Sequence, residues 1–101
     1  MAKQLMVVFS NSAEGKDAAF NEWYDDVHIK DLLSIDGVVS AKRFEVANLE
    51  GASQQYMTIY ELERDGAEVM GELAEGMGTG KFAGSDTVDP TSAVIGFWNP
   101  R

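Results

Sequence analysis

FNEWYDDVH, the stretch at residues 20–28, places the chain's only histidine beside two large aromatic residues on one helical face. At about 100° per residue, Trp23 and Tyr24 each fall within about 60° of Phe20 around a helix. His28 follows one turn beyond Tyr24 on the same flank. The stretch therefore predicts a helix that buries an aromatic stripe and carries one imidazole to the edge of that stripe.

On either side of this stretch, apolar runs predict four strands and a second helix. The predicted aromatic helix covers residues 16–28, and an apolar turn at 29–35 ends at an Asp-Gly turn signal. A polar loop is expected at 48–53, between two of the strands. The predicted strands are residues 5–9, 38–46, 55–62 and 93–98.

Capping residues mark where the two helices begin. Asn11 and Glu14 have the spacing of a capping box before the first helix. Asp65 and Glu68 have the same spacing before the second helix, which we expect to end among Gly76, Gly78 and Gly80. The polar, glycine-rich stretch that follows is predicted to form a flexible lid over a pocket mouth. Its glycines follow a helix instead of preceding one, which argues against a phosphate-binding loop.

The resulting order, β-α-β-β-α-β, determines the fold class. Right-handed crossovers convert it into a four-stranded antiparallel sheet with both helices on one face. The sequence thus predicts an α+β, ferredoxin-like domain over residues 1–101.

The predicted strands are apolar on both faces, although the helices can cover only one. In the first strand, Leu5, Val7 and Phe9 alternate with Met6 and Val8. An uncovered apolar sheet face of several hundred Å² is an aggregation hazard in a monomer. We therefore expect a homodimer in which two sheets pack face to face, closing a dimeric α+β barrel.

The composition limits the partners and the compartment. With 17 acidic and 8 basic residues, the net charge of −9 disfavours binding to nucleic acid or to anionic membranes. The apolar run at residues 5–9 is too short for a signal peptide or a membrane span. No cysteine is present, which leaves no thiolate nucleophile or disulfide and fits a reducing cytoplasm.

The residues around His28 also carry a family resemblance. WYDDVHI at 23–29, DLL at 31–33 and Gly37-Val38 resemble the helix and turn of EthD-like proteins of the dimeric α+β barrel superfamily. Ser85-Asp86 and Asp89-Pro90, before a final aromatic strand, are similar to that group as well. Similar sequences often carry proline where this chain has Lys30 and Asp36.

The resemblance implies a pocket between the helices and the sheet of each subunit, with the histidine of the motif facing it. Members of the superfamily include polyketide cyclases, cofactor-free monooxygenases and muconolactone isomerases. The fold alone therefore does not choose the reaction.

His28 is the first candidate for acid–base chemistry, because an imidazole titrates near neutral pH. Asp25 or Asp31 could orient it and raise its pKa. Two other roles stay open: a structural histidine at a helix end, or a metal ligand, although no strong ligand spacing supports the latter. The residue pattern thus implies no metal and no cofactor.

Tyr24 is the second catalytic candidate, because its hydroxyl could hydrogen-bond a carbonyl or an enolate. The other candidate residues, Asp25 among them, would bind the substrate. Arg43 could pair with a carboxylate ligand or form a surface or interface salt bridge. Buried packing is the alternative role for the aromatic ones. The remaining candidates are Phe20, Trp23, Tyr56, Tyr60 and, at the pocket rim, Asp86.

Two functional hypotheses follow. The first is a small cofactor-independent enzyme, such as a cyclase, dehydratase, isomerase or lyase, that acts on an apolar aromatic or polyketide-like molecule. The second is a non-catalytic dimeric module that binds a hydrophobic ligand or assists an oxidation system.

Overall fold

The computed structural model describes residues 3–48 and 53–101, so most of the predicted 48–53 loop lies outside the described residues. The elements follow the predicted order, and every strand lies within two residues of its predicted bounds. They are β1 (Gln4–Ser10), α1 (Asp17–Trp23), η1 (Tyr24–His28), α2 (Ile29–Leu33), β2 (Val38–Glu45), β3 (Tyr56–Leu62), α3 (Gly66–Thr79) and β4 (Val94–Trp98).

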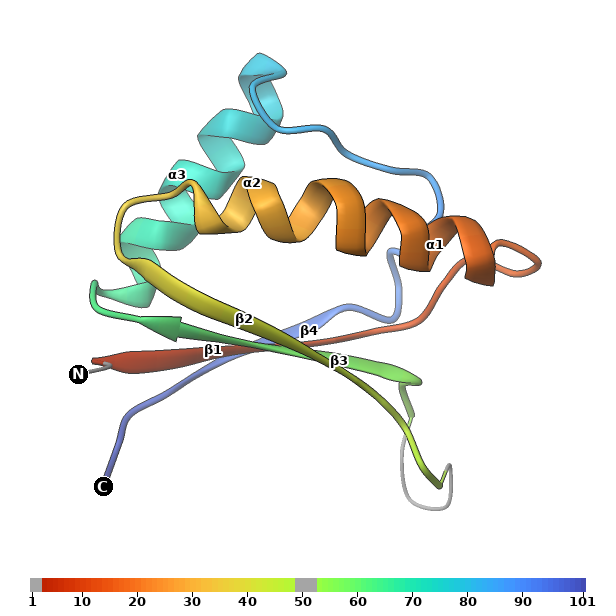
Figure 1. Ribbon diagram of the computed structural model, residues 1–101, viewed down its shortest axis with the longest axis horizontal. Coiled ribbons are helices and arrows are strands. Elements are labelled where there is room, and N and C mark those ends of the chain that lie inside the picture. The colour runs from red at the N-terminus through yellow and green to blue at the C-terminus, as the bar shows by residue number, and fades with distance from the viewer. Residues whose placement is uncertain (1–2, 49–52) are drawn as a thin grey trace.

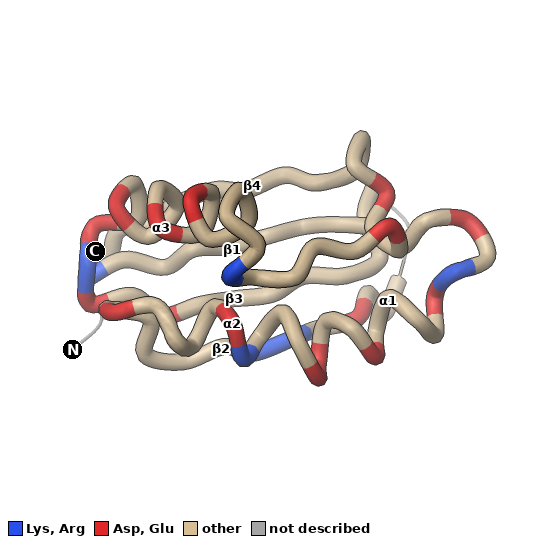
Figure 2. The backbone as a smooth tube through the Cα atoms, turned by 90° about the horizontal axis from the view of Figure 1, so that it is seen from above, with Lys and Arg blue, Asp and Glu red and all other residues tan. Residues whose placement is uncertain are grey.

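The four strands form one antiparallel sheet in the order β2-β3-β1-β4. The α1–α2 helix and α3 lie side by side over one face of this sheet (Figure 1; Figure 2). This arrangement confirms the predicted α+β, ferredoxin-like fold. Seen from the helix side, acidic positions are spread along both helices and basic positions are sparse (Figure 2).

The helix-covered face of the sheet holds the core. In β3, Tyr56, Thr58, Tyr60 and Leu62 are buried, whereas the residues between them are partly or fully exposed. This two-residue period is the alternation expected of a strand with one covered face. The main cluster packs these strands against both helices through Met6, Leu32, Ile35, Val38, Tyr60, Leu62, Val69 and Phe82.

The aromatic helix is longer and less regular than its sequence pattern predicts. It runs without a break from α1 through α2, and its middle turn, η1, is π-helical (Figure 1). The predicted capping box is wrong: Lys16 occupies the N-cap position, and its side chain makes no capping hydrogen bond. Asn11 instead joins the β3 side of the sheet, where its Oδ1 accepts from the Gln55 N–H at 2.7 Å.

The start and the end of α3 both follow the prediction. Asp65 Oδ1 accepts from the Ala67 N–H at 3.2 Å, as an N-cap should, while Glu68 lies 3.7 Å from Arg64. The helix continues through Gly76 and Gly78 and ends only at Gly80, whose φ of +82° is the left-handed conformation that glycine favours. Tertiary packing of α3 on the sheet thus outweighs the low helix propensity of the two internal glycines.

No helix of residues 3–48 or 53–101 covers the opposite face of the sheet (Figure 1). Phe44, Met57, Phe9 and Val94 are register partners and form one row across all four strands. Exposed fractions on this face reach 52% for Val94 and 60% for Trp98. The prediction of an apolar uncovered face is therefore confirmed. Within the described ranges, no helix is long and apolar enough to cross a membrane.

Two glycines of α3 give a matched test of how tightly this helix packs against its neighbours. A Cβ added at Gly76 would lie 2.2 Å from the buried Phe82 ring, whereas one added at Gly71 would meet nothing within 4 Å. We expect Gly76→Ala to destabilise the protein by about 1–3 kcal/mol through overpacking. Gly71→Ala should instead stabilise it by about 0.5–1 kcal/mol, since alanine is the better helix former. Urea denaturation of both variants measures the two effects, and changes of the same sign would contradict this account of α3.

Candidate functional site

The candidate site lies where the aromatic helix packs on β2 and β3. Phe20, Tyr24 and Tyr56 form a buried aromatic cluster between the helix and the sheet. The Phe20 ring lies 5.4 Å from the Tyr24 ring and 5.0 Å from the Tyr56 ring, between centroids. These residues therefore fill the space between helix and sheet next to His28.

The π-helical turn positions His28. In η1 the Ile29 N–H donates to the Tyr24 carbonyl, five residues back, which widens the helix at this point. The His28 ring stacks on Trp23, with centroids 4.5 Å apart and planes 21° from parallel. It also meets Tyr24 edge-on at 4.8 Å, so the imidazole is held between two aromatic rings.

His28 is a neutral imidazole in this environment. Burial is the main cause that lowers its pKa from 6.5 to about 4; the Arg43 charge lowers it further and the Asp31 charge opposes both. Its Nδ1 atom is buried and has no hydrogen-bond partner among the described residues. The predicted rise in the pKa is therefore wrong. Asp31 acts in the predicted direction, but the loss of solvation outweighs it.

Arg43 is the member of the site whose environment the sequence did not predict. Its side chain is only 14% exposed, and Nη1 donates to Asp25 Oδ1 at 2.9 Å. The guanidinium carbon lies 4.4 Å from the centre of the Tyr24 ring and about 5.5 Å from Phe20 and Tyr56. Its Nε and Nη2 atoms are buried and have no hydrogen-bond partner within residues 3–48 and 53–101. The predicted strand at 38–46 carried little signal for this, because Lys42 and Glu45 in it are charged as well.

Two tyrosine hydroxyls meet beneath the helix. Tyr60 Oη donates to Tyr24 Oη at 3.4 Å, and Tyr60 is almost fully buried. Burial is the main cause that raises the pKa of Tyr60, with the neighbouring Tyr24 adding to it. The Tyr60 phenol is therefore protonated at neutral pH and can only donate or accept a hydrogen bond.

The remaining predicted site residues, Tyr56 and Asp86, contact residues near the start of α1. Tyr56 Oη donates to Asp17 and accepts from Asn21 Nδ2 at 3.1 Å. Asp86 forms an exposed ion pair with Lys16 at 3.1 Å. The Tyr56 hydroxyl and the Asp86 carboxylate thus each have a partner near the start of α1.

The segment after α3 passes over the aromatic helix (Figure 1). The Trp23 Nε1–H donates to the Ala83 carbonyl, and Asp31 Oδ2 accepts from the Ala83 N–H, each at 3.3 Å. These two contacts attach the segment to the helix on either side of His28 in the sequence.

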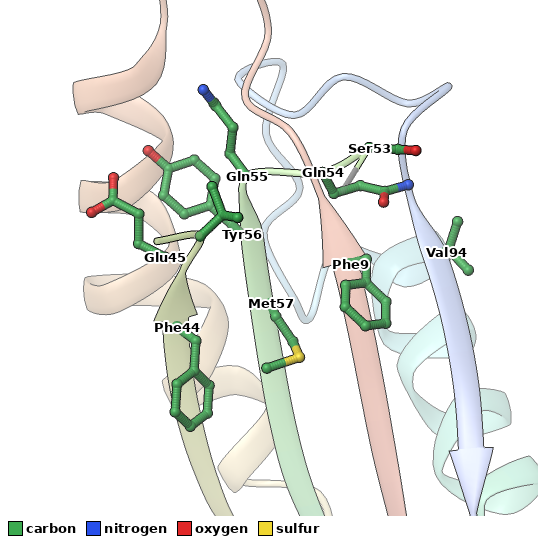
Figure 3. Close-up of a pocket in the computed structure, with 10 residues that line it drawn as sticks. Phe9, Phe44, Glu45, Ser53, Gln54, Gln55, Tyr56, Met57 and Val94 are labelled. Atoms are coloured by element: carbon green, nitrogen blue, oxygen red, sulfur yellow. The ribbon is translucent and has the colours of Figure 1, made fainter. Parts of the chain in front are cut away.

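Two of the surface hollows near β2 involve the uncovered face or the candidate residues. The larger, about 410 Å³, includes the row Phe44, Met57, Phe9 and Val94 on the uncovered face (Figure 3). The smaller, about 270 Å³, is lined by Asn21, Asp25, Arg43, Phe44, Glu45 and Tyr56. His28 lines neither hollow, whereas Arg43 faces the smaller one.

Solved structures of two other proteins share this fold over the whole chain. One is an EthD (ethyl tert-butyl ether D) family protein from Bacillus halodurans C-125; it is 20% identical, with a TM-score of 0.62 and 100% of both chains covered. The other, from Shewanella loihica PV-4, is described as a "putative monooxygenase"; it is 14% identical, with a TM-score of 0.64, 100% of this chain and 97% of that one covered. No family model and no curated protein sequence matches the chain. The resemblance to EthD-like proteins is thereby confirmed at the level of the fold.

The buried imidazole makes stability depend on pH. Because the folded state binds this proton less tightly than an unfolded histidine does, stability present above pH 6.5 is lost as the pH falls toward about 4. We expect the wild type to lose about 2 kcal/mol more than His28→Gln between pH 7 and pH 5. Urea denaturation at the two pH values measures this difference. Equal losses in both proteins would show that His28 is not desolvated.

Proposed function

We propose that this protein is a cytoplasmic, cofactor-independent enzyme that moves a proton on an apolar aromatic or polyketide-like small molecule. The observation that carries the proposal is the His28 Nδ1 atom, which is buried among aromatic rings with no partner among the described residues. A buried polar atom without a hydrogen-bond partner is rare in folded proteins and suggests a bound molecule that supplies one. Cyclisation, dehydration, isomerisation and lyase chemistry all require such a proton acceptor.

The neutral imidazole supports the role of acceptor. At neutral pH His28 is unprotonated and ready to take a proton from a carbon or hydroxyl group. A base with a pKa of about 4 is weak, so an oxyanion formed in the reaction needs stabilisation by neighbouring groups. The hydrogen-bonded hydroxyls of Tyr24 and Tyr60 are suited to contact such an oxygen.

The two aromatic rings beside His28 favour a flat, apolar substrate. Trp23 stacks on the imidazole and Tyr24 meets it edge-on. Aromatic walls bind planar molecules and exclude water from the reacting atoms. For this reason we favour an aromatic or polyketide-like substrate class.

The proposal includes a homodimer formed through the uncovered sheet face. The row Phe44, Met57, Phe9 and Val94, together with Trp98, supports this, because a second copy would remove it from water.

A non-catalytic function is the second candidate. The hollow of about 410 Å³ on the uncovered face is largely apolar and does not include His28 (Figure 3). It would suit a dimeric module that binds a hydrophobic ligand or assists an oxidation system without chemistry at the imidazole.

The proposed acceptor role is tested by NMR of the single imidazole across pH, with a panel of phenolic and polyketide-like compounds. We expect at least one compound to shift the pKa of His28 from its value in the free protein, because the ligand occupies the unpartnered Nδ1. Turnover of that compound should fall at least about 100-fold in His28→Gln. An imidazole that responds to no compound would favour the non-catalytic function instead.

The homodimer is tested with two exposed apolar residues on opposite sides of the protein. Val94 is 52% exposed on the uncovered sheet face, and Leu33 is 41% exposed on α2. We expect Val94→Glu to convert a dimer into a monomer, because it buries a charge in the interface. Leu33→Glu should leave the mass unchanged. Light scattering after gel filtration gives the masses, and a monomeric wild type would contradict the proposal.

A further inference from the structure

Arg43 is a largely buried cation with too few hydrogen-bond acceptors among the described residues. Of its guanidinium nitrogens, Nη1 donates to Asp25, while buried Nε and Nη2 have no partner in the part of the chain that the structure describes. Removing a cation from water is costly unless its donors are paired. Asp25, the carboxylate that pairs with it, is itself 59% exposed and so compensates only partly.

Three aromatic rings offset part of that cost. Tyr24, Tyr56 and Phe20 lie within about 5.5 Å of the guanidinium carbon, close enough for cation–π attraction. Ring faces attract the charge of Arg43 but offer no oxygen to its Nε–H and Nη2–H. Two adjacent free donors on one edge of a guanidinium match the two oxygens of a carboxylate.

We propose that Arg43 binds the anionic oxygens of a planar organic anion, a carboxylate or an enolate, while Asp25 holds the guanidinium in place. The inference rests on the proposed function and names the class of its ligand. The hollow of about 270 Å³ beside β2 gives the ligand a route, since Arg43 and Asp25 both line it.

The same position connects the anion to the imidazole. The Tyr24 ring contacts both Arg43, at 4.4 Å, and His28, at 4.8 Å, so a ligand anchored at Arg43 lies one aromatic ring away from the imidazole. The Arg43 charge is one cause of the low pKa of His28. A bound anion cancels that charge, and it therefore makes His28 a stronger base when the substrate is in place.

Two carboxylates at the hollow oppose an incoming anion. Asp25 and Glu45 both line it, and Asp25 also occupies one donor of the guanidinium. The ligand must turn its anionic group inward, to the free Nε–H and Nη2–H donors and away from Asp25 and Glu45. Asp25 therefore opposes the ligand through its charge, and neutralising it should strengthen binding of an anion but not of a neutral molecule.

Benzoate and benzamide are matched probes for this inference, since they share a planar shape and differ in charge. Binding is measured at pH 7 and moderate salt by NMR of the His28 imidazole. We expect Asp25→Asn to bind benzoate about three- to fivefold more tightly than wild type. Asp26→Asn is the control: it removes the same charge from an adjacent exposed residue and should change the affinity less than twofold. Benzamide should bind both variants equally.

Arg43→Met and Arg43→Lys complete the test. Arg43→Met should abolish benzoate binding, and Arg43→Lys should weaken it at least tenfold, because lysine lacks the paired donors. Equal affinities of Asp25→Asn and Asp26→Asn, or no binding of benzoate to Asp25→Asn, would overturn the inference. If benzamide or neutral phenols shift His28 whatever residue stands at position 43, the proposed function stands and only the preference for anions fails.

Discussion

The candidate site depends on the packing of the Tyr24 ring. This residue is 3% exposed and touches groups from the helix and from the sheet: His28 and Trp23 on its own helix, Arg43 of β2, and the Tyr60 hydroxyl of β3. Dense packing leaves such a ring few alternative positions. A shift of the helix relative to β2 would therefore change the surroundings of the imidazole and of the guanidinium together.

The site holds one permanent positive charge and disfavours a second one. Arg43 is charged at any physiological pH, and it lies close enough to His28 to lower the pKa of the imidazole. Burial acts in the same direction, because the charged imidazole loses more hydration than the neutral one. The pKa of His28 thus depends on how well the charge of Arg43 is compensated. Because a bound anion would compensate that charge, it would also change the ability of His28 to accept a proton.

The sheet uses its two faces for different purposes. On the helix face, aromatic and polar groups meet at positions that alternate with apolar ones, and Arg43 occupies a position next to Thr58. On the other face the row Phe44, Met57, Phe9 and Val94 is apolar across all four strands. Side chains of a strand alternate between the two faces of a sheet. Each strand can therefore present one set of residues to the helices and another, apolar set to the uncovered face.

Local sequence patterns predicted the order of elements, the fold class, the apolar uncovered face and the closeness of Trp23, Tyr24 and His28, because these depend on local periodicity and on near neighbours in the chain. They also indicated that Asp65 begins the second helix and that glycines end it. The other features depend on tertiary contacts. Packing on the sheet selected Gly80 among the three glycines as the end of α3, and the Asn11 side chain, predicted to cap α1, accepts from Gln55 instead. The direction of the His28 pKa shift and the buried state of Arg43 depend on solvent exclusion by residues distant in sequence, which no local pattern encodes.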